Sequence, residues 1–189
     1  MSNPFCVNLD LGFEPTMHPA FNPVLAGRSL RSSWHATIPT DGLDPRITEF
    51  LDGLGISVPH AEVFYSIPGL RRPIHTDGNG LRDLCKINWV YGGAGSYMRW
   101  WIPINSGNGP IFRITSVGTK CIAYEDQDCR VIWKATVGFP SLVQVGVPHD
   151  MVNDGNEPRW CVSYVINDRT TGNPLRWNES VERFSRFMA

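Results

Sequence analysis

The sequence has little net charge, no long apolar run and no Cys-x-x-Cys pair, and each of these absences argues against one class of protein. Its 17 basic and 18 acidic residues nearly cancel and form no basic run. We therefore expect no nucleic-acid footprint and no membrane-attracting surface. No apolar stretch approaches the length of a membrane span, and the first residues lack the charged and apolar regions of a signal peptide. These absences predict a cytoplasmic protein.

The five cysteines are odd in number and irregularly spaced. This pattern argues against both a disulfide framework and a zinc site. We expect reduced, mostly buried thiols at Cys6, Cys85, Cys121, Cys129 and Cys161.

The composition predicts one mainly β domain. The chain has 189 residues and 42% hydrophobic content, enough for one substantial core. Its 18 glycines and 15 prolines fall between short apolar stretches, which is typical of many short strands joined by turns. One helix is predicted at Asp44–Leu54, with Asp44 as its N-cap and Pro45 in its first turn, and a shorter one near Glu179–Phe187.

Residues 61–167 are predicted to form a double-stranded β-helix, or cupin-like jelly roll, with these one or two helices beside it. That architecture packs about eight strands in two facing sheets and holds a ligand cavity between them. We expect an N-terminal extension with the packing helix at 1–60, the β core at 61–167 and a C-terminal segment at 168–189. The predicted strands are 61–67, 73–77, 83–91, 96–102, 111–115, 119–124, 131–135, 141–147 and 160–167.

Two histidines and one aspartate form a metal-ligand pattern. His75 and Asp77 alternate in a predicted strand, so both side chains point to the same side. His149 continues the parity of Val143, Val145 and Val147, and we expect this inward row to deliver it to the cavity. Two imidazoles and one carboxylate bind non-haem Fe(II) on one triangular face and leave positions for a co-substrate and dioxygen. The sequence therefore predicts an Fe(II) site at His75, Asp77 and His149.

Arg159 follows His149 by ten residues and adds a binding group for an acid. A guanidinium presents a planar fork of donors that matches a carboxylate, and it remains charged. His-x-Asp, a distant His and an Arg about ten residues later resemble the signature of the Fe(II)/2-oxoglutarate-dependent dioxygenase superfamily. The approach from Tyr65 to Pro68-Gly69 resembles prolyl-hydroxylase-like members. This resemblance covers about residues 60 to 167, and it implies Fe(II), 2-oxoglutarate as co-substrate and dioxygen.

Further contacts to 2-oxoglutarate are predicted around Arg159. Many members have Ser two residues after this Arg, whereas this chain has Cys161, and Ser163 lies two residues further on the same face. Lys86 and Asn88 share one face of a strand and can assist the arginine; the alternative is a solvated or ion-paired strand face. The Tyr65 hydroxyl either contacts 2-oxoglutarate or belongs to a core aromatic.

Three functions remain open from the sequence. The first is an oxygenase that hydroxylates a peptide side chain or small molecule. Asp77 occupies the place where related halide-transferring enzymes have a small residue, so the resemblance implies hydroxylation or desaturation. The second is a cupin-like metal-binding domain without oxygenase activity, either an isomerase or a small-ligand binder. The third is a catalytically silent β-sandwich that serves as an interaction module.

Overall fold

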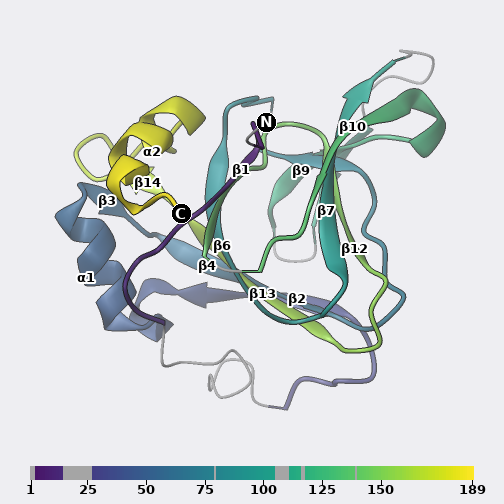
Figure 1. The fold of residues 1–189 in the computed structure, drawn as a ribbon, viewed down its shortest axis with the longest axis horizontal. Helices are drawn as coiled ribbons and strands as arrows, with labels where there is room; N and C mark the ends of the chain where they lie inside the picture. Colours follow the sequence, from purple (N-terminus) through teal and green to yellow (C-terminus); the bar gives the residue numbers. More distant parts are fainter. Residues whose placement is uncertain (1–2, 15–26, 79, 105–110, 116–117, 139) are drawn as a thin grey trace.

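The chain folds into two facing antiparallel sheets, with two helices on the outer side of one of them (Figure 1). The structure is a computed structural model that describes residues 3–14, 27–78, 80–104, 111–115, 118–138 and 140–189. No helix in these ranges is long and apolar enough to cross a membrane.

The first sheet has the strand order β1-β11-β6-β13-β4-β2. Its central strand β13 pairs with β6 on one side and with β4 on the other. The six strands are β1 (Cys6–Asn8), β2 (Trp34–Pro39), β4 (His60–Ser66), β6 (Cys85–Gly92), β11 (Ser141–Gln144) and β13 (Arg159–Val165).

The second sheet has the strand order β10-β7-β12-β5-β9-β8. Its central strand β12 pairs with β7 and β5. The six strands are β5 (His75–Asp77), β7 (Ser96–Pro103), β8 (Ile111–Ile114), β9 (Lys120–Ala123), β10 (Cys129–Ala135) and β12 (His149–Asn153).

The path of the chain confirms the predicted jelly roll. It passes between the sheets from β4 to β5, then to β6 and β7, and after β10 it alternates again through β11, β12 and β13. This places β11-β6-β13-β4 opposite β10-β7-β12-β5, the double-stranded β-helix arrangement, with the β8–β9 hairpin added at the edge beside β5.

The two predicted helices are present and pack outside the first sheet (Figure 1). Helix α1 (Pro45–Gly53) begins after Asp44, whose carboxylate accepts a hydrogen bond from the Arg46 backbone N–H at 3.0 Å. Helix α2 (Trp177–Phe184) begins before the predicted start. Fully buried Ile47 and Phe184 join the outward side chains of the first sheet in the largest apolar core. The short elements are η3 (Thr40–Gly42), β3 (Ile56–Ser57), η4 (Asp126–Asp128), β14 (Asn167–Asp168) and η5 (Ser185–Phe187).

The sequence prediction was wrong at two places. The strand predicted at 141–147 ends at Gln144, and the chain then crosses to the other sheet, where His149 begins a new strand. The crossing is tight at Gly146, because a Cβ there would lie 2.0 Å from the Leu81 carbonyl oxygen. In addition, the stretch before residue 44, for which no regular structure was predicted, contains β1 and β2. The division of the chain into an extension, a core and a C-terminal segment stays a prediction.

Candidate metal centre

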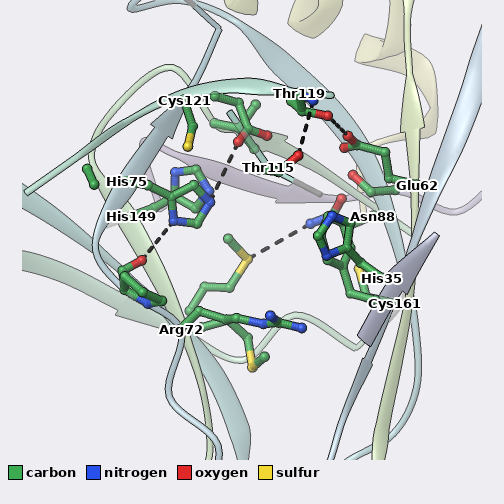
Figure 2. A pocket seen from close by; sticks show the side chains of 18 of the residues that line it. His35, Glu62, Arg72, His75, Asn88, Thr115, Thr119, Cys121, His149 and Cys161 are labelled. Carbon is green, nitrogen blue, oxygen red and sulfur yellow. Dashed lines mark hydrogen bonds and ion pairs between the residues drawn. The ribbon is translucent and has the colours of Figure 1, made fainter. Parts of the chain in front are cut away.

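A cavity of about 220 Å³ lies between the two sheets. By this measure a bound water needs only about 10–15 Å³, so the cavity has room for organic ligands. Strand alternation supplies its walls: on β13, Trp160 and Val162 pack toward the helices, whereas Arg159, Cys161 and Ser163 line the cavity. Figure 2 shows His75 and His149 on one side of the cavity and Asn88, His35 and Cys161 on the other.

The three predicted metal ligands converge at this cavity. His75 on β5 and His149 on β12 are directly opposite each other in neighbouring strands, and their ring centroids are 4.5 Å apart. Asp77 follows on the same face of β5, and its Oδ1 lies 3.6 Å from His75 Nε2. The ligand atoms of all three residues lie within 4.8 Å of one another. Two imidazole nitrogens and one carboxylate oxygen suit Fe(II).

Backbone carbonyls orient both imidazoles for metal binding. His75 Nδ1 lies 2.8 Å from the Pro73 carbonyl oxygen, and His149 Nδ1 lies 2.9 Å from that of Val147. Since a carbonyl only accepts, each Nδ1 carries the proton and donates it. Each Nε2 therefore keeps a lone pair for a metal.

Lys86 holds the third ligand. Its ammonium donates to Asp77 Oδ2 at 2.7 Å and to Glu62 Oε2 at 2.5 Å, and all three groups are largely buried. The second Glu62 oxygen accepts from the Thr119 hydroxyl at 2.6 Å. This pairing occupies one oxygen of Asp77 and leaves Oδ1, the one near His75, for a metal.

The electrostatics favour the metal-binding protonation states. Burial alone raises the pKa of Asp77, but the charge of Lys86 and the two histidines hold it well below its usual range. Burial, followed by the repulsion of His75, lowers the pKa of His149 to about 4. At neutral pH the site therefore offers an ionised carboxylate and a neutral His149.

Arg159 lies at the start of β13, buried in the sheet opposite the triad. Its Nε has no hydrogen-bond partner among the described residues. Gly93 makes room for it: this glycine has φ +65°, and a Cβ there would lie 2.5 Å from Arg159 Cβ. The side chain is therefore packed closely by the backbone while part of its guanidinium lacks a protein acceptor.

Arg72 is a cavity residue for which the sequence analysis predicted no role. It lies three residues before His75, and its Nε and Nη2 are buried without a partner in the described part of the chain. Burial, and then the charge of Arg159, lower the pKa of Arg72. Its position shortly before the strand of His75 and Asp77 is the sequence signal that could have identified Arg72 as a cavity residue.

The other predicted contact residues are divided between the cavity and the core. Asn88 and Ser163 line the cavity. Lys86 is next to it but is engaged by two carboxylates, the ion-paired alternative. Tyr65 is not brought to the site: its hydroxyl donates to the Leu30 carbonyl at 3.0 Å, and its ring packs against Trp160 in the outer core.

Comparisons with known proteins add little to this geometry. No family model and no curated protein matches the sequence. Among solved structures, oxalate oxidase in complex with glycolate is similar, with 16% identity over 92% of this chain and 76% of that chain, and a TM-score of 0.37. The 11S allergen from Cocos nucifera has 15% identity over 84% of this chain and 36% of that one, with a TM-score of 0.41.

An oxalate decarboxylase from Bacillus subtilis is also similar, with 12% identity over 84% of this chain and 31% of that chain, and a TM-score of 0.33. Similarities at this level transfer no residue role and no activity. The strand order supports the fold assignment, and the converging side chains provide the candidate metal site.

Proposed function

We propose that the protein is an Fe(II)- and 2-oxoglutarate-dependent oxygenase that hydroxylates a small molecule or a peptide side chain. The observation that carries this proposal is the buried, partly unpartnered Arg159 facing the same cavity as His75, Asp77 and His149. A triad of this type leaves metal positions open on its far side. A cation across the cavity suits the free end of an acid whose other end chelates the metal.

In this proposal the triad holds the metal and Arg159 holds the co-substrate. His75 and His149 present Nε2, and Asp77 presents Oδ1 while Lys86 restrains its other oxygen. Arg159 orients the distal carboxylate of 2-oxoglutarate. Bound Fe(II) would allow dioxygen to convert 2-oxoglutarate to succinate and carbon dioxide, with the second oxygen atom entering a substrate C–H bond as hydroxyl.

Apolar side chains limit water at the centre of the cavity. Val145, Met151 and Ala123 are buried and line it together with the triad. An environment of this kind strengthens the attraction between Arg159 and a carboxylate, and it protects a reactive site from side reactions.

Succinate formation tests the oxygenase directly. The wild type with Fe(II), 2-oxoglutarate and air is expected to form succinate slowly even without its substrate, and Asp77→Ala to lose most of this activity unless added chloride restores it. Asp126→Asn, a change at an exposed carboxylate, is the matched control. No succinate above the buffer blank, with candidate peptides and small molecules also present, contradicts the proposal.

A second function is favoured by the proximity of two arginines. Because Arg72 and Arg159 face one cavity and repel each other, together they can hold one anion beside a metal without any oxidation. This describes a cupin-like metal-binding domain, an isomerase or a small-anion binder. Metal-dependent binding of anions, combined with absent succinate formation, selects it over the oxygenase.

A further inference from the structure

Arg72 is a half-buried cation, and two of its guanidinium nitrogens are buried. Its Nε and Nη2 are inaccessible and have no partner among the described residues, and Arg159 is the charge that acts most on it. Leaving such donors unpaired is unfavourable, so a side chain in this state is typical of a site completed by a ligand.

The acidic side chains of the cavity are already used. Glu62 accepts from both Lys86 and Thr119, and Asp77 is held by Lys86 and belongs to the metal triad. Neither forms an ion pair with an arginine in the described structure. Neither carboxylate therefore supplies an acceptor for Arg72, and a bound anion can take that place.

The net charge of the cavity groups indicates that the bound molecule is an anion. Arg113 also lines the cavity, but its side chain is exposed to solvent, so we leave it out of the count. The carboxylates of Glu62 and Asp77, the ammonium of Lys86 and a divalent metal together carry one positive charge, and Arg72 and Arg159 raise it to three. One 2-oxoglutarate dianion leaves one positive charge in the buried cavity. A single further carboxylate neutralises it.

The two arginines approach the cavity from different sides. Arg159 pairs with Gly92 in the first sheet, so it is placed to receive an acid that extends across the cavity from the metal. Arg72 precedes the ligand strand of the second sheet, and its backbone N–H donates to the Met151 carbonyl at 2.9 Å. His35, stacked on Phe64, supplies further cavity wall.

We propose that the substrate to be oxidised is itself an organic acid, and that Arg72 binds its carboxylate beside the metal. This inference rests on the proposed function, because it assigns 2-oxoglutarate to Arg159. An amide or an ester of the same substrate lacks the negative charge and is expected to bind poorly.

The arginine Nε–H signals in ¹H–¹⁵N spectra of the Zn²⁺-loaded protein test the assignment. Zn²⁺ replaces Fe(II) because it is diamagnetic, and Arg72→Lys and Arg159→Lys identify the two signals. Arg71 is the internal control, since its Nε already donates to Asp150 Oδ2 at 3.0 Å. The probes are 2-oxoglutarate and then, with 2-oxoglutarate at saturation, acetate or uncharged acetamide.

We expect 2-oxoglutarate to move the Arg159 signal and to leave those of Arg72 and Arg71 in place. Acetate should then move the Arg72 signal saturably, whereas acetamide should not. In Arg72→Lys, acetate binding, followed in the same spectra through the backbone N–H signals of the cavity strands, should weaken at least tenfold while the response of Arg159 to 2-oxoglutarate is retained.

Other results overturn the inference. If 2-oxoglutarate moves both signals and acetate has no further effect, the two arginines clamp one carboxylate and Arg72 has no substrate of its own. A linear, non-saturating response of Arg72 to acetate has the same meaning. If 2-oxoglutarate moves neither signal, the proposed function itself fails.

Discussion

Arg71 and Arg72 are neighbours in the sequence, yet they belong to opposite kinds of charge cluster. Arg71 donates to Asp150 at 3.0 Å and to Asp126 at 2.6 Å. Asp150, whose side chain is fully buried, also accepts from Arg99 and from the Trp101 indole. Arg72 faces the cavity between the sheets with two buried nitrogens unpartnered in the described chain.

The difference separates structural arginines from ligand-binding ones. In the Asp150 cluster every cation has an acceptor, and burial of the carboxylate is offset by four donor contacts. In the cavity, Arg72 and Arg159 repel each other, and three of their guanidinium nitrogens are buried without a partner among the described residues. Such an arrangement lowers stability, and proteins tolerate it where binding requires it. Mutation of a cavity arginine should therefore weaken ligand binding without lowering stability, whereas mutation in the Asp150 cluster should lower stability without weakening binding.

Arg159→Met should have the largest effect, and on binding rather than on folding. Loss of the cation leaves the distal carboxylate of 2-oxoglutarate buried without its counter-charge, a penalty of about 2–5 kcal/mol. We expect 2-oxoglutarate affinity, measured by anaerobic titration calorimetry, to fall well over tenfold while metal binding persists.

The same variant should fold at least as stably as the wild type, because a buried charge without a carboxylate partner among the described residues has been replaced by an apolar side chain of similar length. Urea denaturation without ligands measures this. A clear loss of stability together with unchanged 2-oxoglutarate affinity would place Arg159 with the structural arginines.

Asp150→Asn should show the opposite pattern. Removing the charge leaves Arg99 and Arg71 without their shared carboxylate, and we expect unfolding free energy to fall by about 3 kcal/mol. Since Asp150 is not among the cavity-lining residues, 2-oxoglutarate affinity of the folded fraction should change little. Asp126→Asn removes only the exposed contact of Arg71 and should be nearly neutral.

Gly93→Ala should disturb the cavity cluster indirectly. The added methyl group meets Arg159 Cβ at 2.5 Å, and the backbone φ of +65° is unfavourable for alanine. We expect a displaced guanidinium and 2-oxoglutarate binding weaker by about 1.4 kcal/mol, or tenfold. Gly138→Ala is the matched control, because its Cβ would meet nothing within 4 Å. Equal affinity in the two variants would show that the position of Arg159 does not depend on this glycine.

The smallest effect concerns Asp168, an acid outside both clusters. Its hydrogen bond with Arg183 and then the backbone N–H of Thr171 lower its pKa from 3.8 to about 2. A depressed pKa contributes stability above pH 3.8, and this contribution is lost as the pH falls through about 2. Acid denaturation of Asp168→Asn should show a slightly shallower dependence on pH than the wild type. An identical profile would show that the pair of Asp168 and Arg183 does not contribute to stability.

The sequence predicted the parts of the site that depend on local spacing. Alternation along one strand placed His75 and Asp77 on one face, and the same argument grouped Lys86 with Asn88. It could not reveal that Lys86 is held by Glu62, since that contact depends on how β4 and β6 flank β13. The crossing after Gln144 was missed because apolar alternation continues through it.

Arg72 illustrates the remaining limit. Two consecutive arginines before a ligand strand look equivalent in the sequence, and only tertiary structure directs Arg71 toward Asp150 and Arg72 toward the cavity. A missing partner is a property of the folded surroundings, which spacing does not encode.

The central claim is that Arg159 and the triad hold one molecule of 2-oxoglutarate on Fe(II). Its most direct test is the visible absorption spectrum of the Fe(II)-loaded protein during anaerobic addition of 2-oxoglutarate. The wild type and Arg71→Met should develop a saturable charge-transfer band at similar 2-oxoglutarate concentrations, and Arg159→Met should require at least tenfold more. Absence of the band in Fe(II)-loaded wild type at saturating 2-oxoglutarate, or its unchanged appearance in Arg159→Met, would contradict the account.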